Sequence, residues 1–202
     1  MEQSGRCSFV LVGVGGQGIL LASNIVAEVG LAAGYDVKKS EVHGMSQRGG
    51  SVASHVRWDR RQVFSPLVGH GEADVLLAFE RMEALRFADF VRSGGTVVVN
   101  DMEIVPITVS AGDAVYPATA EVERAFAAVG ARLIVVPGER LATEAGNVKA
   151  ANVVLLGAIS TLLPIDEELW WRCLAERIPN KFLELNHAAF AAGRAAVTAK
   201  AC

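Results

Sequence analysis

Short apolar runs along the chain alternate with longer stretches in which apolar residues recur at helical spacing. The runs at residues 9–12 and 73–79 are continuous, which is typical of strands covered on both faces of a sheet. Further strands are predicted at residues 37–43, 51–58, 96–100 and 132–136. Because helical stretches separate most of these runs, the pattern predicts an α/β fold: a Rossmann-like, three-layer α/β/α open sheet, mostly parallel.

The helical stretches divide the chain into two parts. In the first part, helices are predicted at residues 19–33, 80–91 and 119–129. Beyond the last strand the pattern is helical throughout, with helices predicted at residues 142–146, 148–163 and 181–198 and one more after Asp166. We expect a single domain over residues 1–202, with a sheet core at 1–138 and a helical C-terminal part at 139–202.

Two details of the last part follow from helix geometry. Asp166 is expected to cap its helix, because Glu167 and Glu168 follow it at the positive end. Trp170 and Trp171 are neighbours on that helix and point about 100° apart. One of them therefore lies either half-exposed beside the core or in a subunit contact.

Composition narrows the function classes. The chain has 202 residues, 51% of them hydrophobic, which indicates surface reserved for another subunit or an alanine-rich core. Its net charge of −3 gives no electrostatic case for binding nucleic acid. The N-terminus lacks the pattern of a signal peptide, and the apolar residues 150–163 are too few to span a bilayer.

The cysteines argue against a metal centre in this chain. Cys7, Cys173 and Cys202 are odd in number, far apart and without a CxxC motif. The chain alone is therefore expected to build neither a zinc site nor an iron–sulfur cluster. His55 has no second His or Cys at ligand spacing, so no metal site is predicted. This cysteine usage fits a reducing, cytoplasmic setting.

The first strand leads into a glycine-rich turn. This turn precedes a helix. Its glycines and its one polar side chain are candidates for binding a ligand: Gly13, Gly15, Gly16, Gln17 and Gly18. Strand, glycine turn and helix in this order let backbone N–H groups and the helix N-terminus approach a phosphate. We expect Gly15, Gly16, Gln17 and Gly18 to present their backbone N–H groups to an anion, and Gln17 also its side-chain amide. The same turn also serves packing in many sheets, so an anion cradle and a packing turn are both open interpretations.

The second strand places lysines where nicotinamide-binding folds place an acidic residue. Lys38 and Lys39 lie about twenty residues past the glycine turn. A basic pair there suits a ribose that carries an extra phosphate, as in NADP or coenzyme A. Alternatively, both lysines are simply solvated at a strand end.

A polar loop, residues 44–50, follows this strand. Arg48 offers a planar, permanently charged group for phosphate or carboxylate. In the alternative interpretation, Arg48 forms an ion pair with Glu41 or with a carboxylate of a partner subunit and does not contact a ligand. The neighbouring candidates that shape the same edge or dock a partner are Glu41, His43, Gln47, Gly49 and Gly50. The glycine turn, this loop, Glu80 and Asn100 all follow strands, so they are expected to meet at one edge of the sheet.

Several segments together carry a family resemblance. They read GVGGQGILLAS (13–23), SEVHGMSQRGGSVASHVR (40–57), FSPLVGHGEADVLLAFE (64–80), GGTVVVN (94–100), NVVLLGA (152–158) and NHAAF (186–190). Together they resemble the gamma subunits and gamma domains of the 2-oxoacid:ferredoxin oxidoreductases, and within them the beta subunit of the indolepyruvate type. The resemblance covers almost the whole chain.

The resemblance implies a function. Such an enzyme converts an arylpyruvate and coenzyme A into the aryl-acetyl-CoA and CO2, and passes two electrons to ferredoxin. It also implies that a large alpha subunit carries thiamine diphosphate, magnesium and [4Fe–4S] clusters. This chain would be the small subunit that closes the active site and contacts coenzyme A, and no catalytic residue is assigned to it. The residues also leave two alternatives open: an NADP-dependent Rossmann dehydrogenase, and a non-catalytic scaffold that docks a partner.

Overall fold

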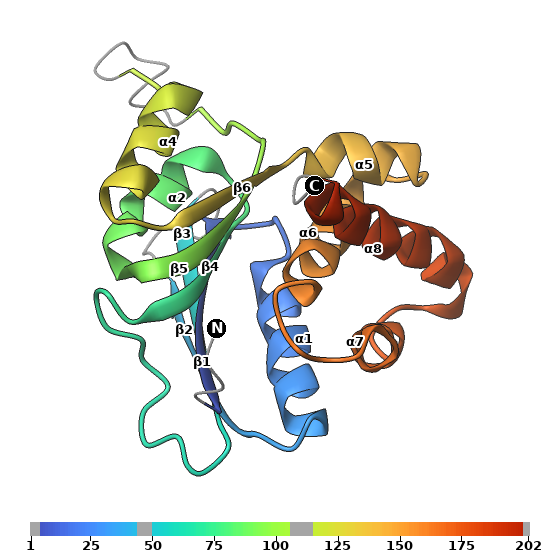
Figure 1. Cartoon of the computed structure of the whole chain (residues 1–202). Helices are drawn as coiled ribbons and strands as arrows, with labels where there is room; N and C mark the ends of the chain where they lie inside the picture. The colour runs from blue at the N-terminus through green and yellow to red at the C-terminus, as the bar shows by residue number, and fades with distance from the viewer. Residues whose placement is uncertain (1–4, 44–49, 106–114, 200–202) are drawn as a thin grey trace.

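The computed structural model describes residues 5–43, 50–105 and 115–199. A six-stranded sheet with the order β2-β3-β1-β4-β5-β6 forms its centre (Figure 1). The strands are β1 (Arg6–Val14), β2 (Asp36–His43), β3 (Ser51–Asp59), β4 (Ala73–Ala78), β5 (Val91–Asn100) and β6 (Arg132–Val136). Every strand predicted from the sequence is present.

Strand directions place the ends of most strands at one edge. β1, β4, β5 and β6 pair in parallel, whereas β3 is antiparallel to both β1 and β2. The parallel strands and β2 therefore all end at the same edge, which we call the carboxyl edge, and β3 begins there. The opposite side is called the amino edge.

Helices cover both faces of the sheet, so the molecule has the three layers that the sequence pattern predicts. α2 (Arg81–Arg86) and α4 (Thr119–Ala128) lie on one face. The other face carries α1 (Ile19–Ala32), α5 (Gly138–Glu144), α6 (Ala151–Ser160), α7 (Glu167–Ala175) and α8 (Leu183–Thr198) (Figure 1). Beyond β6 the described chain is helical.

The two helical layers enclose separate cores. On β1, Phe9 and Leu11 pack with the layer that contains α1 and α6. Val10 and Val12 alternate with them and pack with α2 and α4. This two-sided burial explains why residues 9–12 of the strand are all apolar.

Helices α6 and α8 approach each other at two glycines. A Cβ atom added to Gly157 would lie 2.1 Å from the carbonyl oxygen of Phe190. One added to Gly193 would lie 1.9 Å from the carbonyl oxygen of Val154. Backbone thus rests directly on backbone at this crossing, which no side chain larger than hydrogen permits.

Some helix predictions are wrong in extent. The helix predicted at residues 80–91 is only α2 followed by a 3-10 turn, Ala88–Phe90. It stops because Val91 is already paired with Ala73 in the sheet. The helix predicted at residues 148–163 is α6, preceded by the 3-10 turn Val148–Ala150.

The predictions around α7 are confirmed in part. The helix begins directly after Asp166, but that side chain makes no capping hydrogen bond, so its capping role is wrong. Trp170 is fully buried, whereas Trp171 is half-buried and meets the ring of His187 edge-on at 4.6 Å. The two tryptophans thus point apart. No helix in the described part of the chain is long and apolar enough to cross a bilayer.

Candidate functional site

The glycine turn between β1 and α1 combines packing with open backbone. Gly16 and Gly18 have positive φ angles of 105° and 83°. A Cβ on Gly13 would lie 2.8 Å from the Cβ of Phe79, and one on Gly18 would lie 2.5 Å from Nδ2 of Asn152. A Cβ on Gly16 would meet nothing within 4 Å. Gly13 and Gly18 therefore serve close packing, while the surface beside Gly16 is open.

Only some of the turn's N–H groups are free to meet an anion. Gly15 donates to the carbonyl of Gly50 at 3.0 Å, and Gln17 donates to the carbonyl of Val14 at 3.2 Å. Among the described residues, the N–H groups of Gly16 and Gly18 have no partner. The prediction that Gly15 and Gln17 present their backbone amides to a ligand is corrected accordingly. Gly16, Gly18 and the first turn of α1 keep that capacity.

The side chain of Gln17 is engaged inside the chain. Its Oε1 accepts a hydrogen bond from the N–H of Val14 at 2.7 Å. Its Nε2 donates to the carbonyl of Phe79 at 3.0 Å and lies 3.3 Å from the sulfur of Met102. The predicted contact between this amide and an anion is therefore replaced by a positioning role: Gln17 ties the glycine turn to the ends of β4 and β5.

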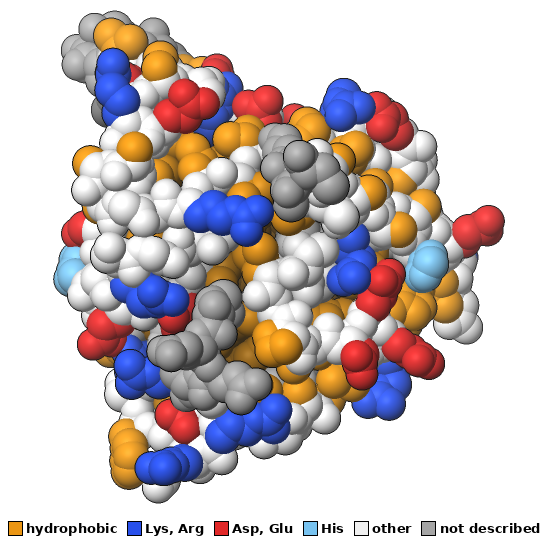
Figure 2. All heavy atoms as spheres, viewed as in Figure 1, with side chains coloured by type: hydrophobic (Ala, Val, Ile, Leu, Met, Phe, Trp, Pro, Cys, Tyr) orange, Lys and Arg blue, Asp and Glu red, His pale blue; other side chains and the backbone are white. Residues whose placement is uncertain are grey.

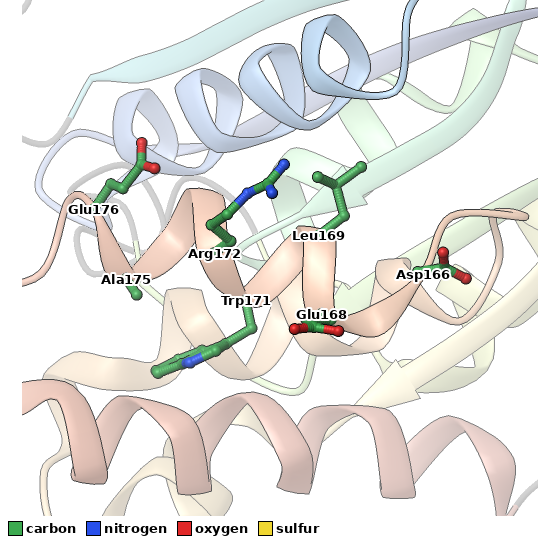
Figure 3. A pocket seen from close by; sticks show the side chains of 7 residues that line it. All are labelled: Asp166, Glu168, Leu169, Trp171, Arg172, Ala175 and Glu176. Carbon is green, nitrogen blue, oxygen red and sulfur yellow. The ribbon is translucent and has the colours of Figure 1, made fainter.

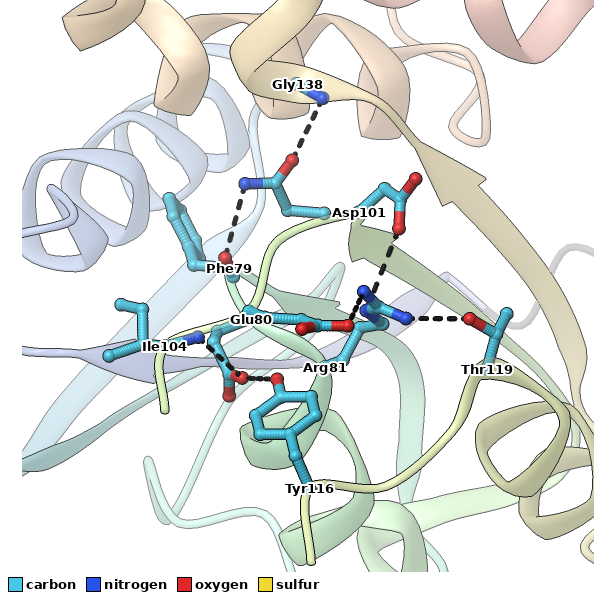
Figure 4. Close-up of polar contacts among 10 residues, drawn as sticks. Phe79, Glu80, Arg81, Asp101, Ile104, Tyr116, Thr119 and Gly138 are labelled. Carbon is cyan, nitrogen blue, oxygen red and sulfur yellow. Dashed lines mark hydrogen bonds and ion pairs between the residues drawn. The ribbon is translucent and has the colours of Figure 1, made fainter. Parts of the chain in front are cut away.

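Asn100 makes the second connection at the carboxyl edge. It is buried, and its Nδ2 donates to the carbonyl of Phe79 at 3.3 Å. Its Oδ1 accepts from the N–H of Gly138 at 2.9 Å (Figure 4). Asn100 and Gln17 thus share one carbonyl as acceptor, and Asn100 also holds the start of α5. This confirms that the glycine turn and Asn100 meet at one edge.

Glu80 and Arg81 fix the chain after β5 against the same edge (Figure 4). Glu80 is buried and accepts hydrogen bonds from the N–H of Glu83 at 2.8 Å and from the hydroxyl of Tyr116. Arg81 donates to Thr119 at 2.7 Å and pairs with Glu103. The segments on both sides of residues 106–114 are therefore anchored to the end of β4.

Glu83 anchors the point where the predicted polar loop ends. The hydroxyl of Ser51 donates to Oε2 of Glu83 at 2.5 Å. Burial raises the pKa of Glu83 and the charge of Glu80 adds to it, whereas Ser51 and Arg86 act in the opposite direction. Together with the bond between Gly15 and Gly50, this contact holds residues 50–51 beside the glycine turn.

We expect Glu83→Gln to remove part of the pH dependence of stability. The pKa of Glu83 is raised in the folded state. The contribution of this carboxyl group to the free energy of unfolding is therefore greatest below its unfolded pKa of about 4.3, and it is lost as the pH rises through the folded pKa. Gln keeps an acceptor for Ser51 without the charge. Each unit of raised pKa corresponds to about 1.4 kcal/mol.

Urea unfolding at pH 5 and pH 7.5 measures this effect. The difference in the free energy of unfolding between Glu83→Gln and the unmutated chain should favour the variant more at pH 7.5 than at pH 5. Glu123→Gln on the exposed side of α4 is the matched control and should leave the pH dependence unchanged. Equal pH slopes for Glu83→Gln and the unmutated chain would contradict the expectation.

The predicted lysine pair is separated by the pleat of β2. Lys38 and Lys39 are neighbours in a strand and point to opposite faces. The ammonium of Lys39 bonds to Oδ1 of Asn24 on α1 at 2.5 Å and pairs with Glu41. Lys38 is 3.9 Å from Asp36. The two ammonium groups therefore do not share one face of the strand, and Glu41 is engaged by Lys39.

Part of the predicted site cannot be placed. Gln47, Arg48 and Gly49 lie outside the described residues, as does the side chain of His43. Gly50 is described, and its carbonyl accepts the bond from Gly15. The described residues on either side of 44–49, His43 at the end of β2 and Ser51 at the start of β3, both lie at the carboxyl edge.

Two surface hollows lie away from the glycine turn. One of about 750 Å³ lies along α7, where Figure 3 shows Trp171 and Arg172 pointing to opposite sides of the helix. It is lined by Asp166, Glu168, Leu169, Trp171, Arg172, Ala175 and Glu176. The other, near His55 and Phe90, lies under residues 67–72 on the amino-edge side. None of the predicted site residues lines either hollow.

The described residues offer no metal site. Within them no three His, Cys, Asp or Glu side chains gather closely enough to hold an ion. Cys7 and Cys173 are free and buried, and burial raises the pKa of both thiols. Neither thiol is therefore suited to act as a thiolate ligand.

Comparison with known proteins decides the family. Residues 8–196 match the family described as pyruvate ferredoxin/flavodoxin oxidoreductase. The chain belongs to this family.

Relatives of similar length lie within the pyruvate ferredoxin/flavodoxin oxidoreductase family. The chain is 42% identical to indolepyruvate oxidoreductase subunit IorB of Thermococcus kodakarensis, over 92% of this chain and 93% of that protein. It is 40% identical to the IorB subunit of Archaeoglobus fulgidus, over 90% of each chain. A 2-oxoglutarate synthase subunit KorC of Methanothermobacter thermautotrophicus is 26% identical over 91% of each.

Two solved structures share the fold. The gamma subunit of a keto/oxoacid ferredoxin oxidoreductase from Geobacter sulfurreducens superposes with a TM-score of 0.71 at 24% identity, covering 96% of this chain and 99% of that one. The 2-oxoglutarate:ferredoxin oxidoreductase from Magnetococcus marinus gives 0.76 at 22% identity. The match covers 98% of this chain but 32% of that longer one, which was solved with 2-oxoglutarate, coenzyme A and succinyl-CoA bound.

Three contacts at the carboxyl edge could not be predicted from the sequence. Asn152 abuts Gly18, Met102 meets Gln17, and Ser51 bonds to Glu83. Each pair is separated by 32 or more residues, so no local spacing connects its members. The sequence indicated only that polar residues, Glu80 and Asn100, lie at the ends of two strands near this edge.

Proposed function

We propose that this chain is the small subunit of an indolepyruvate ferredoxin oxidoreductase. In that reaction an arylpyruvate and coenzyme A give the aryl-acetyl-CoA and CO2, and two electrons pass to ferredoxin. The observation that supports it most is the 40–42% identity to IorB subunits over at least 90% of the chain. The chain is a single gamma-type domain in this proposal, and the reducing cytoplasm suits its free cysteines.

The redox groups belong to a large alpha subunit in this proposal. A [4Fe–4S] cluster needs thiolate ligands, and the two described cysteines are buried with raised pKa values. The described residues therefore do not fit a cluster. We assign thiamine diphosphate, magnesium and the clusters to the partner.

The contribution of this chain is an anion-binding edge that closes the partner's active site. The N–H groups of Gly16, Gly18 and the first turn of α1 have no partner among the described residues, the surface beside Gly16 is open, and together they suit a phosphate of coenzyme A. Arg48 adds a permanent positive charge from the adjoining loop. Gln17 and Asn100 position the turn through their shared bond to Phe79. No residue of this chain takes or gives a proton in this proposal.

The substitution Arg48→Ala tests the coenzyme A contact. In the complex assembled from both subunits, we expect the KM for coenzyme A to rise about 10-fold or more, the size of one lost charge-assisted hydrogen bond. The KM for indolepyruvate should stay within a factor of about two. Arg124→Ala on the exposed side of α4 is the control.

The alternatives make different predictions in the same experiment. A scaffold that only docks a partner leaves the KM for coenzyme A unchanged and weakens assembly. An NADP-dependent dehydrogenase binds NADPH as an isolated chain, which a fluorescence titration detects. Because Lys38 and Lys39 point to opposite faces of β2, the pair gives no argument for NADP over coenzyme A. A complex that oxidises 2-oxoglutarate but not indolepyruvate would overturn the substrate assignment.

A further inference from the structure

The loop between β3 and β4 carries a large aromatic side chain into solvent. Residues 60–72 join the two strands at the amino edge, and Figure 1 shows this loop extending beyond the sheet, away from the helices. Phe64 is 88% exposed and Leu67 is 53% exposed. A lone exposed apolar residue is common, but two within one protruding turn form a small apolar tip. We call residues 64–67 the Phe64 tip.

The Phe64 tip is held between two buried anchors. Val63 and Val68 flank it, and both are buried. The N–H of Val63 donates to Oδ2 of Asp36 at 2.7 Å, and the N–H of Val68 donates to Nδ1 of the buried His55 at 3.2 Å. The tip is therefore ordered by the fold itself, which reduces the entropy lost when it docks on another surface.

Two arginines without an ion pair in the described residues precede the tip in the same loop. The guanidinium of Arg60 lies 3.8 Å from the centre of the Tyr35 ring and donates to the carbonyl of Ala33. Arg61 is exposed, and its backbone N–H bonds to Asp59 at 2.8 Å. Across the described ranges, neither arginine side chain has an ion pair. In Figure 2, hydrophobic and basic surface adjoin at the lower left, over this loop.

We propose that the Phe64 tip docks into an apolar pocket rimmed by carboxylates on the large partner subunit. The inference rests on the proposed function, which supplies that partner. Phe64 is the anchor, and Arg60 and Arg61 face the acidic rim. A second copy of this chain fits less well, because a symmetric contact through the tip would bring the same arginines of both copies together. The tip is also too small to supply the apolar area of a stable homodimer.

The test measures assembly of the two full-length subunits by titration in an interaction assay. Phe64→Ser should raise the Kd between subunits at least 10-fold, as loss of an aromatic anchor does. Arg61→Glu should raise it about 3- to 10-fold and make it less sensitive to salt. Because Phe64 is solvent-exposed, thermal unfolding of the isolated chain should not change.

Phe182→Ser is the matched control. Phe182 is also an exposed phenylalanine, at 41%, and lies next to Lys181, but it precedes α8 on another part of the surface. Its replacement should leave the Kd within a factor of two. An unchanged Kd for Phe64→Ser, in subunits that do assemble, overturns the inference.

Two other outcomes separate this inference from the proposed function. If the unmutated chain fails to assemble with the large subunit, the proposed function fails, whatever Phe64 does. If the isolated chain is a dimer that Phe64→Ser converts into a monomer, a second copy occupies the tip and the inference is overturned. Analytical ultracentrifugation of the isolated chain distinguishes these cases.

Discussion

Gly193→Ala is expected to lower the free energy of unfolding by about 3 kcal/mol, at the upper end of the usual cost of overpacking. In an exposed helix the same change raises stability by about 1 kcal/mol, because Ala is the better helix former. Here the new Cβ would lie 1.9 Å from the carbonyl oxygen of Val154. The obstacle is backbone, so no rotation of a side chain relieves it, and α6 and α8 must move apart.

Chemical denaturation of the isolated chain measures this loss. The matched control is Ala191→Leu, which adds more volume on the exposed side of α8 and should change the free energy by less than about 0.5 kcal/mol. Gly157→Ala should resemble Gly193→Ala, since its Cβ would lie 2.1 Å from the carbonyl oxygen of Phe190. A more stable Gly193→Ala protein would show that the two helices are not in backbone contact.

Asn100→Ala is expected to lower the free energy of unfolding by about 2–4 kcal/mol. The change leaves the buried N–H of Gly138 without its acceptor and removes one of the two amides that donate to the carbonyl of Phe79. Each orphaned buried group costs about 1–3 kcal/mol. Gln17 still donates to the same carbonyl, which keeps the loss below the sum of two full penalties.

A second expected effect of Asn100→Ala is on the KM values of the complex assembled from both subunits. Because Asn100 holds the start of α5 at the carboxyl edge, its loss should raise the KM for coenzyme A more than the KM for indolepyruvate. Asn186→Ala is the control, since its amide donates to the carbonyl of Phe182 at 2.9 Å on a more exposed surface. We expect a loss of less than about 1 kcal/mol there. Equal losses for both variants would remove the special role of Asn100.

Much of the fold follows from local sequence signals. Apolar runs such as residues 9–12 identified the strands, because a strand covered on both faces must be apolar at every position. The alternation of strands and helices identified the three layers. Helix ends were less predictable: α2 stops at Arg86 because Val91 is needed for pairing with β4, which no local pattern records.

The candidate site was predictable in location but not in chemistry. Polar residues after strands, such as Asn100, meet at the carboxyl edge, because parallel strands share that edge. Whether a given amide faces a ligand depends on its other partners. Gly15 and Gln17 have partners within the chain, whereas Gly16 faces open surface, and these facts appear only when distant segments are brought together.

The sequence by itself determined the class of fold, the strand order along the chain, the glycine turn and the family, since each depends on the identity and spacing of nearby residues. Tertiary structure alone decided which groups remain free. It placed Lys38 and Lys39 on opposite faces of β2, joined Gln17 and Asn100 at one carbonyl, and left Phe64 exposed between two buried valines. The physical reason is that a group is hydrogen-bonded or buried only when another segment packs against it, and that segment is often dozens of residues away in the chain.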